Sequence, residues 1–312
     1  MTSESHATKG EAVLLVLNKH DDTMSFVDPT TLRSFAQVEA GHDPHEFVIT
    51  PCQRFAHVSN YAPPGDTVTV IDLKLRRRML QIPTGRFTRI HGAAIAPDGR
   101  HAYFTAGQTG FVVEVDLETN QVTRGIATHG EVSHMVVVSR GGERLYTANV
   151  GSRNVSVIDI ASGRLLTQVP CDAGCEGLTF TPDHAFLWAA NQDAGNITVI
   201  DIATHTAVET ISCPGVPLRV RFTAGGELAL VTNWVAEGEL VIMDVAARRE
   251  VKRLRVGNQP IGIEIAPDGA RAFVTNMSSD DIHVIDMATL SVARRFETGK
   301  GPDAMQWWRM PG

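Results

Sequence analysis

The sequence predicts an all-β chain that forms a seven-bladed β-propeller, and three observations support this fold class. Short apolar segments that end in Asp recur seven times along the 312 residues, at spacings of 42 to 44 residues. Each repeat holds four short apolar segments, one of which ends in this Asp, and all four are rich in Val, Ile, Thr and Phe, as is typical of β-strands. No segment carries a sustained helical stripe of apolar residues. Seven units of four short strands each predict a propeller of four-stranded antiparallel blades.

The predicted strands of one unit follow in a fixed order. The first ends at a turn similar to Pro-Asp-Gly, as at Pro97 or Pro267, the second ends in Asn in six units, the third ends in Asp, and the fourth follows a polar turn. The Asp residues are Asp28, Asp72, Asp116, Asp159, Asp201, Asp244 and Asp286. The Asn residues are Asn18, Asn60, Asn149, Asn191, Asn233 and Asn276, with Ala106 in the seventh place. Both sets are interpreted as structural, because these side chains can bond the backbone N–H groups of the turns that follow them.

The two ends of the chain predict how the ring closes. The first unit begins directly at its second strand, EAVLLVLN, whereas the chain ends in GPDAMQWW, which matches the first-strand segment of the other units. We therefore expect the C-terminal strand to pair with the N-terminal blade, which leaves no open sheet edge around the ring. Residues 12–312 are then a single seven-bladed domain, with Trp307 and Trp308 in its core. Residues 1–11 are expected to be a flexible tail.

The chain resembles the YVTN-type seven-bladed β-propeller repeat family over almost its whole length, from about Ala12 to Trp308. The resemblance is carried by segments such as RLYTANVGSRNVSVIDIASG and RAFVTNMSSDDIHVIDMATL. It implies a propeller of the lactonase-like or WD40-like kind. Such propellers include lactonases, lyases, electron-transfer partners and pure binding scaffolds, so the fold by itself does not imply a function.

Composition and charge exclude several classes of function. The chain is 43% hydrophobic and 20% charged, as expected of a folded globular protein. Its formal net charge of -7 disfavours a nucleic-acid partner, because binding to the phosphate backbone relies on clustered Lys and Arg. The basic run from Lys74 to Arg78 is interpreted as a solvated outer turn, with a nucleic-acid or protein contact as the alternative. The polar N-terminus and the lack of a long apolar stretch predict a cytoplasmic protein without a membrane partner.

The candidate site lies where the seven units differ. In a propeller the starts of the innermost strands surround one mouth of the central channel, where ligands usually bind. The units are aligned on their first turn, with Ser139 in the Pro place of the fourth unit. The position six residues before that turn holds His45, His91, Ser133, Glu176, Leu218, Ile261 and Asp303. The following position holds Glu46, Gly92, His134, Gly177, Arg219, Gly262 and Ala304.

Three imidazoles and several carboxylates are expected to converge at this mouth. The predicted ligands of a divalent metal ion, which would be Zn, Mn, Fe or Ni, are His45, His91, His134 and Asp303. A bound ion would polarise a carbonyl and activate a water molecule. Glu46 and Glu176 are the candidates for the catalytic base. The alternative interpretation is that these polar side chains are solvated or bonded to the neighbouring backbone.

The remaining differences predict how a substrate binds. We expect Arg219 to hold the carboxylate or phosphate of a small anionic compound, while Leu218 and Ile261 pack on its apolar part. Tyr61 and Trp234 both follow a repeated Asn and are candidates for an aromatic wall at the same mouth, with ordinary loop packing as the alternative.

Together these residues predict a metal-assisted enzyme that acts on a small anionic carbonyl compound. Hydrolysis of the lactonase type is the leading reaction, and lyase or isomerase chemistry comes next. The alternative function is a non-catalytic scaffold that binds a protein partner or a small ligand. Cys171, Cys175 and Cys213 are interpreted as small, partly buried apolar residues, with oxidation to a pair or ligation of a soft metal as the alternative.

Overall fold

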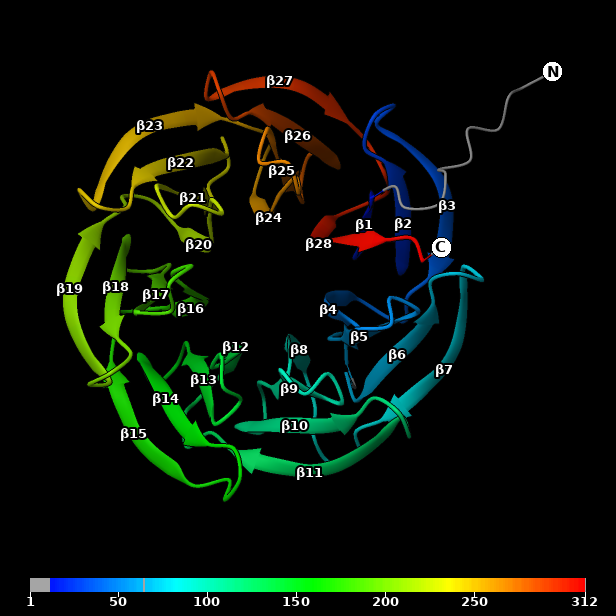
Figure 1. The fold of residues 1–312 in the computed structure, drawn as a ribbon, viewed down its shortest axis with the longest axis vertical. Coiled ribbons are helices and arrows are strands. Elements are labelled where there is room, and N and C mark those ends of the chain that lie inside the picture. Colours follow the sequence, from blue (N-terminus) through cyan, green and yellow to red (C-terminus); the bar gives the residue numbers. More distant parts are fainter. Residues whose placement is uncertain (1–11, 64, 312) are drawn as a thin grey trace.

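The computed structural model describes residues 12–63 and 65–311, and every regular element within them is a β-strand. The strands form seven four-stranded antiparallel sheets arranged as blades around a central channel (Figure 1). This confirms the predicted all-β, seven-bladed propeller. The predicted tail at residues 1–11 lies outside the described residues. No helix in the described part of the chain is long and apolar enough to cross a membrane.

The blades are numbered 1 to 7 along the chain, and in each the strands are given from the channel outward. The strands of blades 1 to 4 are β28 (Pro302–Arg309), β1 (Ala12–Asn18), β2 (Thr23–Asp28), β3 (Arg33–Glu39); β4 (Pro44–Ile49), β5 (Phe55–Asn60), β6 (Thr67–Asp72), β7 (Arg77–Pro83); β8 (Ile90–Ile95), β9 (His101–Ala106), β10 (Phe111–Asp116), β11 (Gln121–Ala127); β12 (Ser133–Val138), β13 (Arg144–Asn149), β14 (Asn154–Asp159), β15 (Leu165–Pro170). The strands of blades 5 to 7 are β16 (Cys175–Phe180), β17 (Phe186–Asn191), β18 (Asn196–Asp201), β19 (Thr206–Ser212); β20 (Pro217–Phe222), β21 (Leu228–Asn233), β22 (Glu239–Asp244), β23 (Arg249–Arg255); β24 (Pro260–Ile265), β25 (Arg271–Asn276), β26 (Asp281–Asp286), β27 (Ser291–Phe296).

The ring closes as the chain ends predict. β28, the last strand, pairs antiparallel with β1, the first, in a register that places Val13 opposite Trp308. The Trp308 side chain is 1% exposed, packs edge-on against Phe26 and donates its Nε1–H to the backbone oxygen of Gln53 in blade 2. Trp307 packs against Phe273 in blade 7. The two tryptophans therefore join blade 1 to both of its neighbours.

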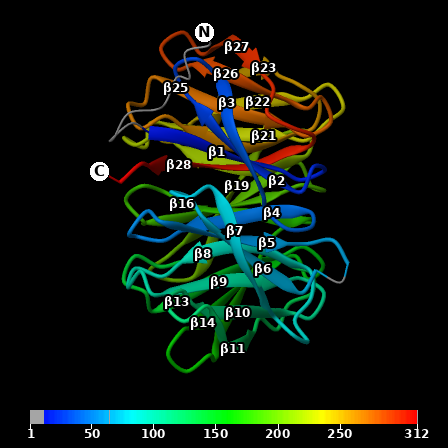
Figure 2. The ribbon, with the colours of Figure 1, turned by 90° about the vertical axis from the view of Figure 1, so that its right-hand side faces the viewer.

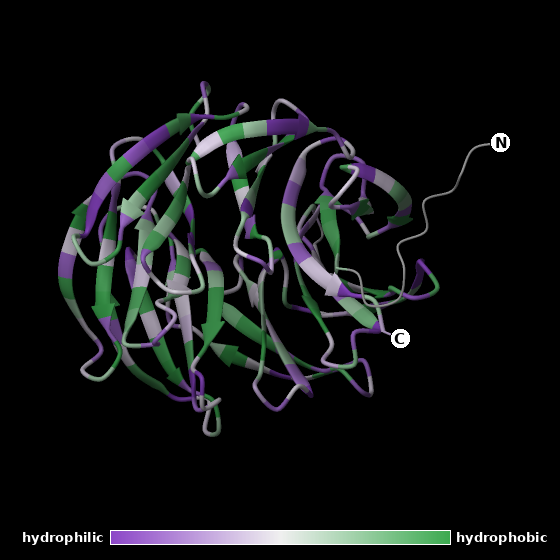
Figure 3. Cartoon of the chain, turned by 45° about the horizontal axis from the view of Figure 1, so that its top comes forward, coloured by the Kyte–Doolittle hydropathy of each residue, from purple (hydrophilic) through white to green (hydrophobic). Residues whose placement is uncertain are grey.

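The hydrophobic core consists of seven separate layers, one between each pair of neighbouring blades. The layer between blades 1 and 2, for example, contains Leu15 and Phe26 from one blade and Phe47 and Val58 from the other. Figure 3 shows apolar residues along the inner and middle strands, whereas many polar residues lie in the turns and on the outer strands. Because every blade buries both faces against its neighbours, the channel wall carries little of the packing and its residues are free to vary.

The repeated Asp and Asn residues have the structural roles predicted for them, with one difference. Each Asp accepts a backbone N–H from the turn that follows it, as Asp244 does from Ala247 at 2.8 Å. The buried Asn side chains instead bond the neighbouring third strand. Asn18 donates to the Ser25 hydroxyl at 2.8 Å. Asn therefore ties two strands of one blade together near the mouth, in place of the predicted turn contact.

Candidate functional site

A β-bulge near the start of every innermost strand positions the candidate residues. In β4 the register with β5 shifts between Pro44 and Phe47, and the same shift occurs in the other six innermost strands. One extra residue in the innermost strand leaves two consecutive residues opposite a single partner, and such bulges re-aim side chains. His45 and Glu46 are one such pair, and the backbone of Glu46 is bonded to the Ser59 hydroxyl through both its N–H and its C=O. The seven bulges form the channel mouth.

The structure corrects the predicted alignment in blade 4. Ser133 pairs with Asn149 as Pro44 pairs with Asn60, so His134, and not Ser133, is equivalent to His45. The turn of blade 4 has Arg140 where blade 2 has Pro51. The predicted alignment placed Ser139 opposite Pro51 instead, which shifted blade 4 by one residue. The corrected first position of the bulge holds His45, His91, His134, Glu176, Leu218, Ile261 and Asp303. Three imidazoles thus occupy the same position in three consecutive blades.

The three imidazoles contact one another, as their alignment predicts. The ring centroids of His45 and His91 lie 4.5 Å apart, and those of His91 and His134 lie 3.7 Å apart. His45 and His91 are 5% and 4% exposed. Tyr61 stacks on His45 with a centroid distance of 4.7 Å and so lies at the mouth, while its part in an aromatic wall for a ligand stays a prediction. The guanidinium of Arg89 lies 4.7 Å above the Tyr61 ring.

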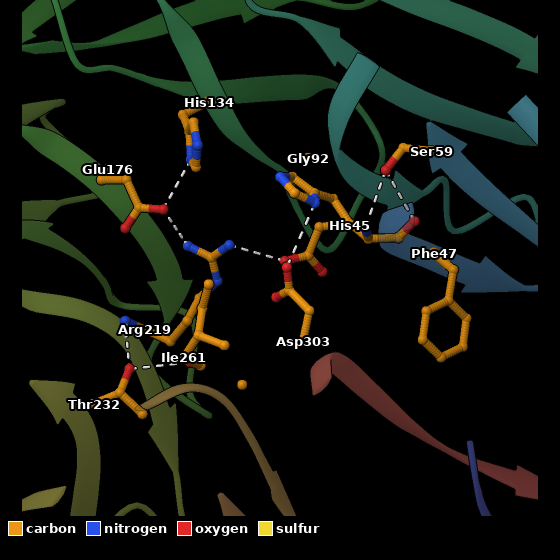
Figure 4. A network of polar contacts seen from close by, with 12 residues as sticks. His45, Phe47, Ser59, Gly92, His134, Glu176, Arg219, Thr232, Ile261 and Asp303 are labelled. Carbon is orange, nitrogen blue, oxygen red and sulfur yellow. Dashed lines mark hydrogen bonds and ion pairs between the residues drawn. The ribbon is translucent and has the colours of Figure 1, made fainter. Parts of the chain in front are cut away.

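A chain of charged contacts crosses the mouth (Figure 4). Glu176 is 3% exposed and lies between His134 and Arg219. Its Oε1 is 2.8 Å from Nδ1 of His134, although the ring N–H does not point directly at this oxygen, and it also accepts from Arg219. The other terminal nitrogen of Arg219 donates to Glu46 at 3.0 Å from the far side of the ring. Arg219, expected to bind a substrate anion, is therefore already paired with two carboxylates.

A second group of contacts surrounds His45. Nζ of Lys19 lies 3.0 Å from its Nε2 and 3.9 Å from the carboxylates of Asp43 and Asp303. An ammonium only donates, so Nε2 of His45 accepts and the ring proton is on Nδ1. That Nδ1 faces Oδ2 of Asp303 at 3.5 Å. Lys19 is not among the residues predicted from the sequence, although it follows a repeated Asn just as Tyr61 and Trp234 do.

Burial and neighbouring charges separate the protonation states of these groups. Burial, together with the nearby Lys19 ammonium, holds the pKa of His45 well below its usual value, and burial beside His134 does the same to the pKa of His91. Burial raises the pKa of Asp303 to about 7 against the opposing effect of Lys19. Burial would also raise the pKa of Glu176, but Arg219 and His134 outweigh it and bring that pKa to about 2. Near neutral pH two imidazoles are neutral, one carboxyl is poised to exchange a proton and one is fixed as the anion.

Behind the mouth the channel holds a cavity of about 210 Å³ that is lined by residues of all seven innermost strands. Glu46 and Arg219 line it at the mouth, and its apolar side chains include Met135, Leu178 and Ile263. Larger hollows, of about 270, 290 and 340 Å³, lie at turns between neighbouring blades, around Pro267, Pro182 and Pro97. Because these hollows recur at equivalent turns, we interpret them as features of the repeat. The cluster of buried ionisable side chains at the channel mouth has no such copies elsewhere in the described chain.

The predicted metal ligands are adjacent, but their contacts do not fit a resident ion in this arrangement. Within residues 12–63 and 65–311, no group of three or more His, Cys, Asp or Glu side chains is placed to hold a metal. Nε2 of His45 faces the Lys19 ammonium, and Nδ1 of His134 faces Glu176, a candidate base that is itself paired with Arg219. The divalent metal stays a prediction, and no chemical step is derived through it.

The other predicted residues divide into two groups. Leu218 and Ile261 occupy the same bulge position as the imidazoles, in blades 6 and 7, where they form the apolar part of the mouth. Trp234 is half-buried in the β21–β22 loop, and no ring or hydrogen-bond contact joins it to the mouth residues within the described chain. The cysteines are free thiols. Cys175 and Cys213 lie in the layers between blades, which agrees with their interpretation as small apolar residues.

Comparisons with known proteins agree on the fold. Residues 137–268, less than half of the chain, match the family model of the cytochrome D1 heme domain. Hydrazine synthase from Kuenenia stuttgartiensis superposes with a TM-score of 0.77 at 21% identity, covering 92% of this chain and 99% of that one. A functionally unknown protein from Desulfotomaculum acetoxidans gives 0.81 at 16% identity, covering 96% and 99%. No curated protein matches the chain. The chain is thus a seven-bladed propeller similar to the cytochrome D1 heme domain, and these likenesses show the fold alone.

The residues present do not fit a haem at this mouth. His45, His91 and His134 all lie outside the matched segment. The cavity behind them, about 210 Å³, is smaller than the roughly 300–1,000 Å³ of typical ligand pockets. The mouth itself is occupied by contacts between charged side chains. No step is therefore derived through a haem.

Proposed function

We propose that the channel mouth is the catalytic site of an enzyme that acts on a small carbonyl compound by general acid–base chemistry. Hydrolysis of a lactone is the leading reaction, and lyase or isomerase chemistry comes next. The observation that carries the proposal is the contact between Glu176 and His134 beside two neutral, buried imidazoles. As part of the same proposal we assign the repeat to the YVTN type, on its sequence segments. A cytoplasmic location stays a prediction.

The Glu176–His134 contact supports His134 as the general base. A carboxylate beside Nδ1 favours the tautomer that carries its proton there, which leaves Nε2 free to accept a proton. The His134 side chain is 21% exposed, so water and substrate reach it. Glu176, with a pKa of about 2, is a weak base itself and acts by orienting His134. This assigns to His134 the role that the sequence suggested for Glu46 or Glu176.

The proposed reaction begins when Nε2 of His134 takes a proton from a water molecule. The hydroxide attacks the carbonyl carbon, the ring C–O bond breaks, and the leaving alkoxide receives a proton from the Asp303 carboxyl. The product is a hydroxy acid. The proton on His134 then returns through solvent to Asp303. A pKa near 7 suits Asp303 to this exchange, because acids and bases work best close to the operating pH.

The charges of the mouth support an uncharged substrate rather than the predicted anionic one. Both terminal nitrogens of Arg219 are paired with carboxylates, and Lys19 lies among His45, Asp43 and Asp303. A substrate anion would compete with these carboxylates for the same two cations. A lactone ring carries no charge, and its apolar part would pack against Leu218 and Ile261 in the unpaired part of the mouth.

The test is proton release from a panel of uncharged lactones, followed by pH-stat with the full chain. We expect turnover of at least one lactone by the wild type and a loss of about 10²–10⁴-fold in kcat for His134→Gln. His101→Gln is the matched control, because His101 contacts the Asp98 carboxylate at 2.7 Å far from the mouth. The proposal fails if no lactone is turned over, or if His134→Gln retains the activity of His101→Gln.

A further inference from the structure

The outermost strand of blade 2 and the turn before it are unusually open. Eight consecutive residues, 74–81, are exposed, covering the turn that follows Asp72 and most of β7. Among them Leu75, Met79 and Leu80 are 52%, 44% and 40% exposed, which makes this stretch the densest group of large exposed apolar side chains in the described chain. Figure 2 shows β7 running along the outside of the ring.

The same stretch carries four cations, and within the described residues only one of them has an ion-pair partner. Arg78 pairs with Glu39 of blade 1, and Arg76 stacks over Phe35 at 5.2 Å. Within the described residues Lys74 and Arg77 have no ion-pair partner. The whole chain has a net charge of -7, whereas residues 74–81 carry a net positive charge.

Strand β23 provides an internal comparison. It is also an outermost strand rich in Arg, and two of its four cations pair with carboxylates within the described chain. Arg253 pairs with Glu239 and Glu250, and Arg255 pairs with Glu237. The two strands differ in their apolar side chains, because Val251 is the only large exposed one in β23, whereas β7 and its turn carry Leu75, Met79 and Leu80.

The backbone of β7 is open on its outer side. β7 pairs with β6 along one edge and is the last strand of its sheet. Every second N–H and C=O of such an edge strand points away from the sheet and can pair with another extended chain. A bulge at Met79 adds one residue between Arg78 and Leu80, so apolar and basic side chains stand next to each other along this edge.

We propose that the outer edge of β7 binds an extended acidic segment of a partner protein, which adds to blade 2 as a fifth strand. Backbone hydrogen bonds would give the register, Lys74 and Arg77 would pair with carboxylates, and Leu75, Met79 and Leu80 would cover alternate apolar side chains of the segment. This goes beyond the chemistry proposed for the channel mouth and does not depend on it.

Charge and geometry select this occupant over two others. A second copy would bring two basic β7 edges together, and like charges across an interface oppose association. A membrane surface of anionic lipid would attract the cations but offers no partner for a row of backbone N–H and C=O groups. The buried area of a single added strand is small, so the complex is expected to be transient, with a dissociation constant in the micromolar range.

The test is fluorescence anisotropy with the full chain and a labelled peptide that alternates Glu and Val over seven residues, the length of β7. We expect saturable binding that weakens as salt is raised. The double variant Arg77→Glu/Met79→Asp should weaken it at least 10-fold. The matched control, Arg294→Glu/Val292→Asp, changes β27, another exposed outer strand, and should bind like the wild type.

Two further probes keep the outcome decisive. A peptide with Pro at its centre should fail to bind, because Pro cannot complete the strand pairing. Vesicles of mixed phosphatidylserine and phosphatidylcholine should not compete. The proposal is overturned if the acidic peptide does not bind the wild type, if the β7 and β27 variants lose binding equally, if the Pro peptide binds as well as the parent, or if only the vesicles bind. Thermal unfolding of each variant confirms that these exposed substitutions leave the fold intact.

Discussion

The channel mouth has two arcs that share one backbone and differ in chemistry. Blades 1 to 5 place Asp303, His45, His91, His134 and Glu176 at the first bulge position, whereas blades 6 and 7 place Leu218 and Ile261 there. The bulge and the strand pairing are the same in both arcs. Fold stability resides in the layers between blades, so the mouth is where the sequence varies without loss of the ring. The difference between the arcs is therefore the best guide to function.

The polar arc is also the costly one. Its ionisable groups are buried, and burial of a charge is tolerated only when the charge is paired. Glu176 meets this condition through Arg219, while His45 and His91 meet it by remaining neutral. The apolar arc requires no such compensation. Two kinds of change test this difference between the arcs. One substitutes a residue of one arc by its counterpart in the other, and the other removes the strand that closes the ring.

The largest effect is expected from deleting residues 301–312, which removes β28 and with it the closure on which both arcs depend. We expect the cooperative thermal unfolding transition to be lost, because β28 supplies Trp308 and Met305 to the layers on both sides of blade 1, and a domain is stabilised by only roughly 5–15 kcal/mol. Trp308→Ala is the milder variant and should cost about 3–5 kcal/mol. An unchanged melting temperature after the deletion would show that closure through β28 is wrong.

Glu176→Leu, which places in blade 5 the residue that blade 6 carries, should have the next largest effect. It leaves Arg219 with Glu46 alone and His134 without a carboxylate, so we expect a loss of about 3 kcal/mol in urea unfolding at pH 7. Ile261→Leu in the apolar arc is the control and should cost less than about 1.5 kcal/mol. Equal losses at the two positions would remove the distinction between the arcs.

Glu176 and Asp303 should respond to pH with opposite signs. The pKa of Glu176 is lowered from 4.5 to about 2, so its contribution to stability is present above pH 4.5 and lost as the pH falls toward 2. The pKa of Asp303 is raised from 3.8 to about 7, so the folded state binds its proton more tightly and stability is lost as the pH rises from 3.8 through 7.

Asp303→Asn should therefore raise the free energy of unfolding at pH 8 relative to the wild type more than it does at pH 4. Urea titrations at the two pH values measure this. A larger gain at pH 4 than at pH 8 would contradict the proposed protonation of Asp303.

The smallest effect is expected from metal ions. Because the contacts of His45 and His134 do not fit a resident ion, Zn, Mn, Fe or Ni salts should shift the melting temperature of the wild type no more than that of a His45→Ala/His91→Ala variant. The salts are compared in thermal-shift assays on protein purified without a His tag. A stabilisation seen only with the wild type would restore the metal site that the sequence predicted.

Most of the fold could be predicted from the sequence because the same pattern of strands and turns recurs seven times. The Asp turns, the blade count and the closure by β28 all follow from spacing. The alignment failed by one residue where Arg140 replaces the Pro of the first turn, and the pairing of Ser133 with Asn149 corrected it. The corrected alignment places His134 at the same bulge position as His45 and His91, whereas the predicted alignment placed it one position later.

The contacts between blades could not be predicted in this way. Arg219 reaches Glu46 across the ring, and Lys19 reaches His45 from a loop of the neighbouring blade. Neither contact follows from periodicity, which fixes where a residue lies but not which distant side chain it meets. These two contacts changed the expected roles of Arg219 and His45, and with them the expected charge of the substrate.

The most direct test of the account is nitrogen-detected NMR of the imidazoles in the full chain, titrated from pH 6 to pH 8. We predict that His45 stays neutral throughout as the tautomer with its proton on Nδ1, and that His134 carries its proton on Nδ1 in its neutral form, with Glu176→Gln weakening that preference. If His45 is protonated at pH 7, or if the neutral His134 carries its proton on Nε2, then the mouth does not present the base that the proposed chemistry requires.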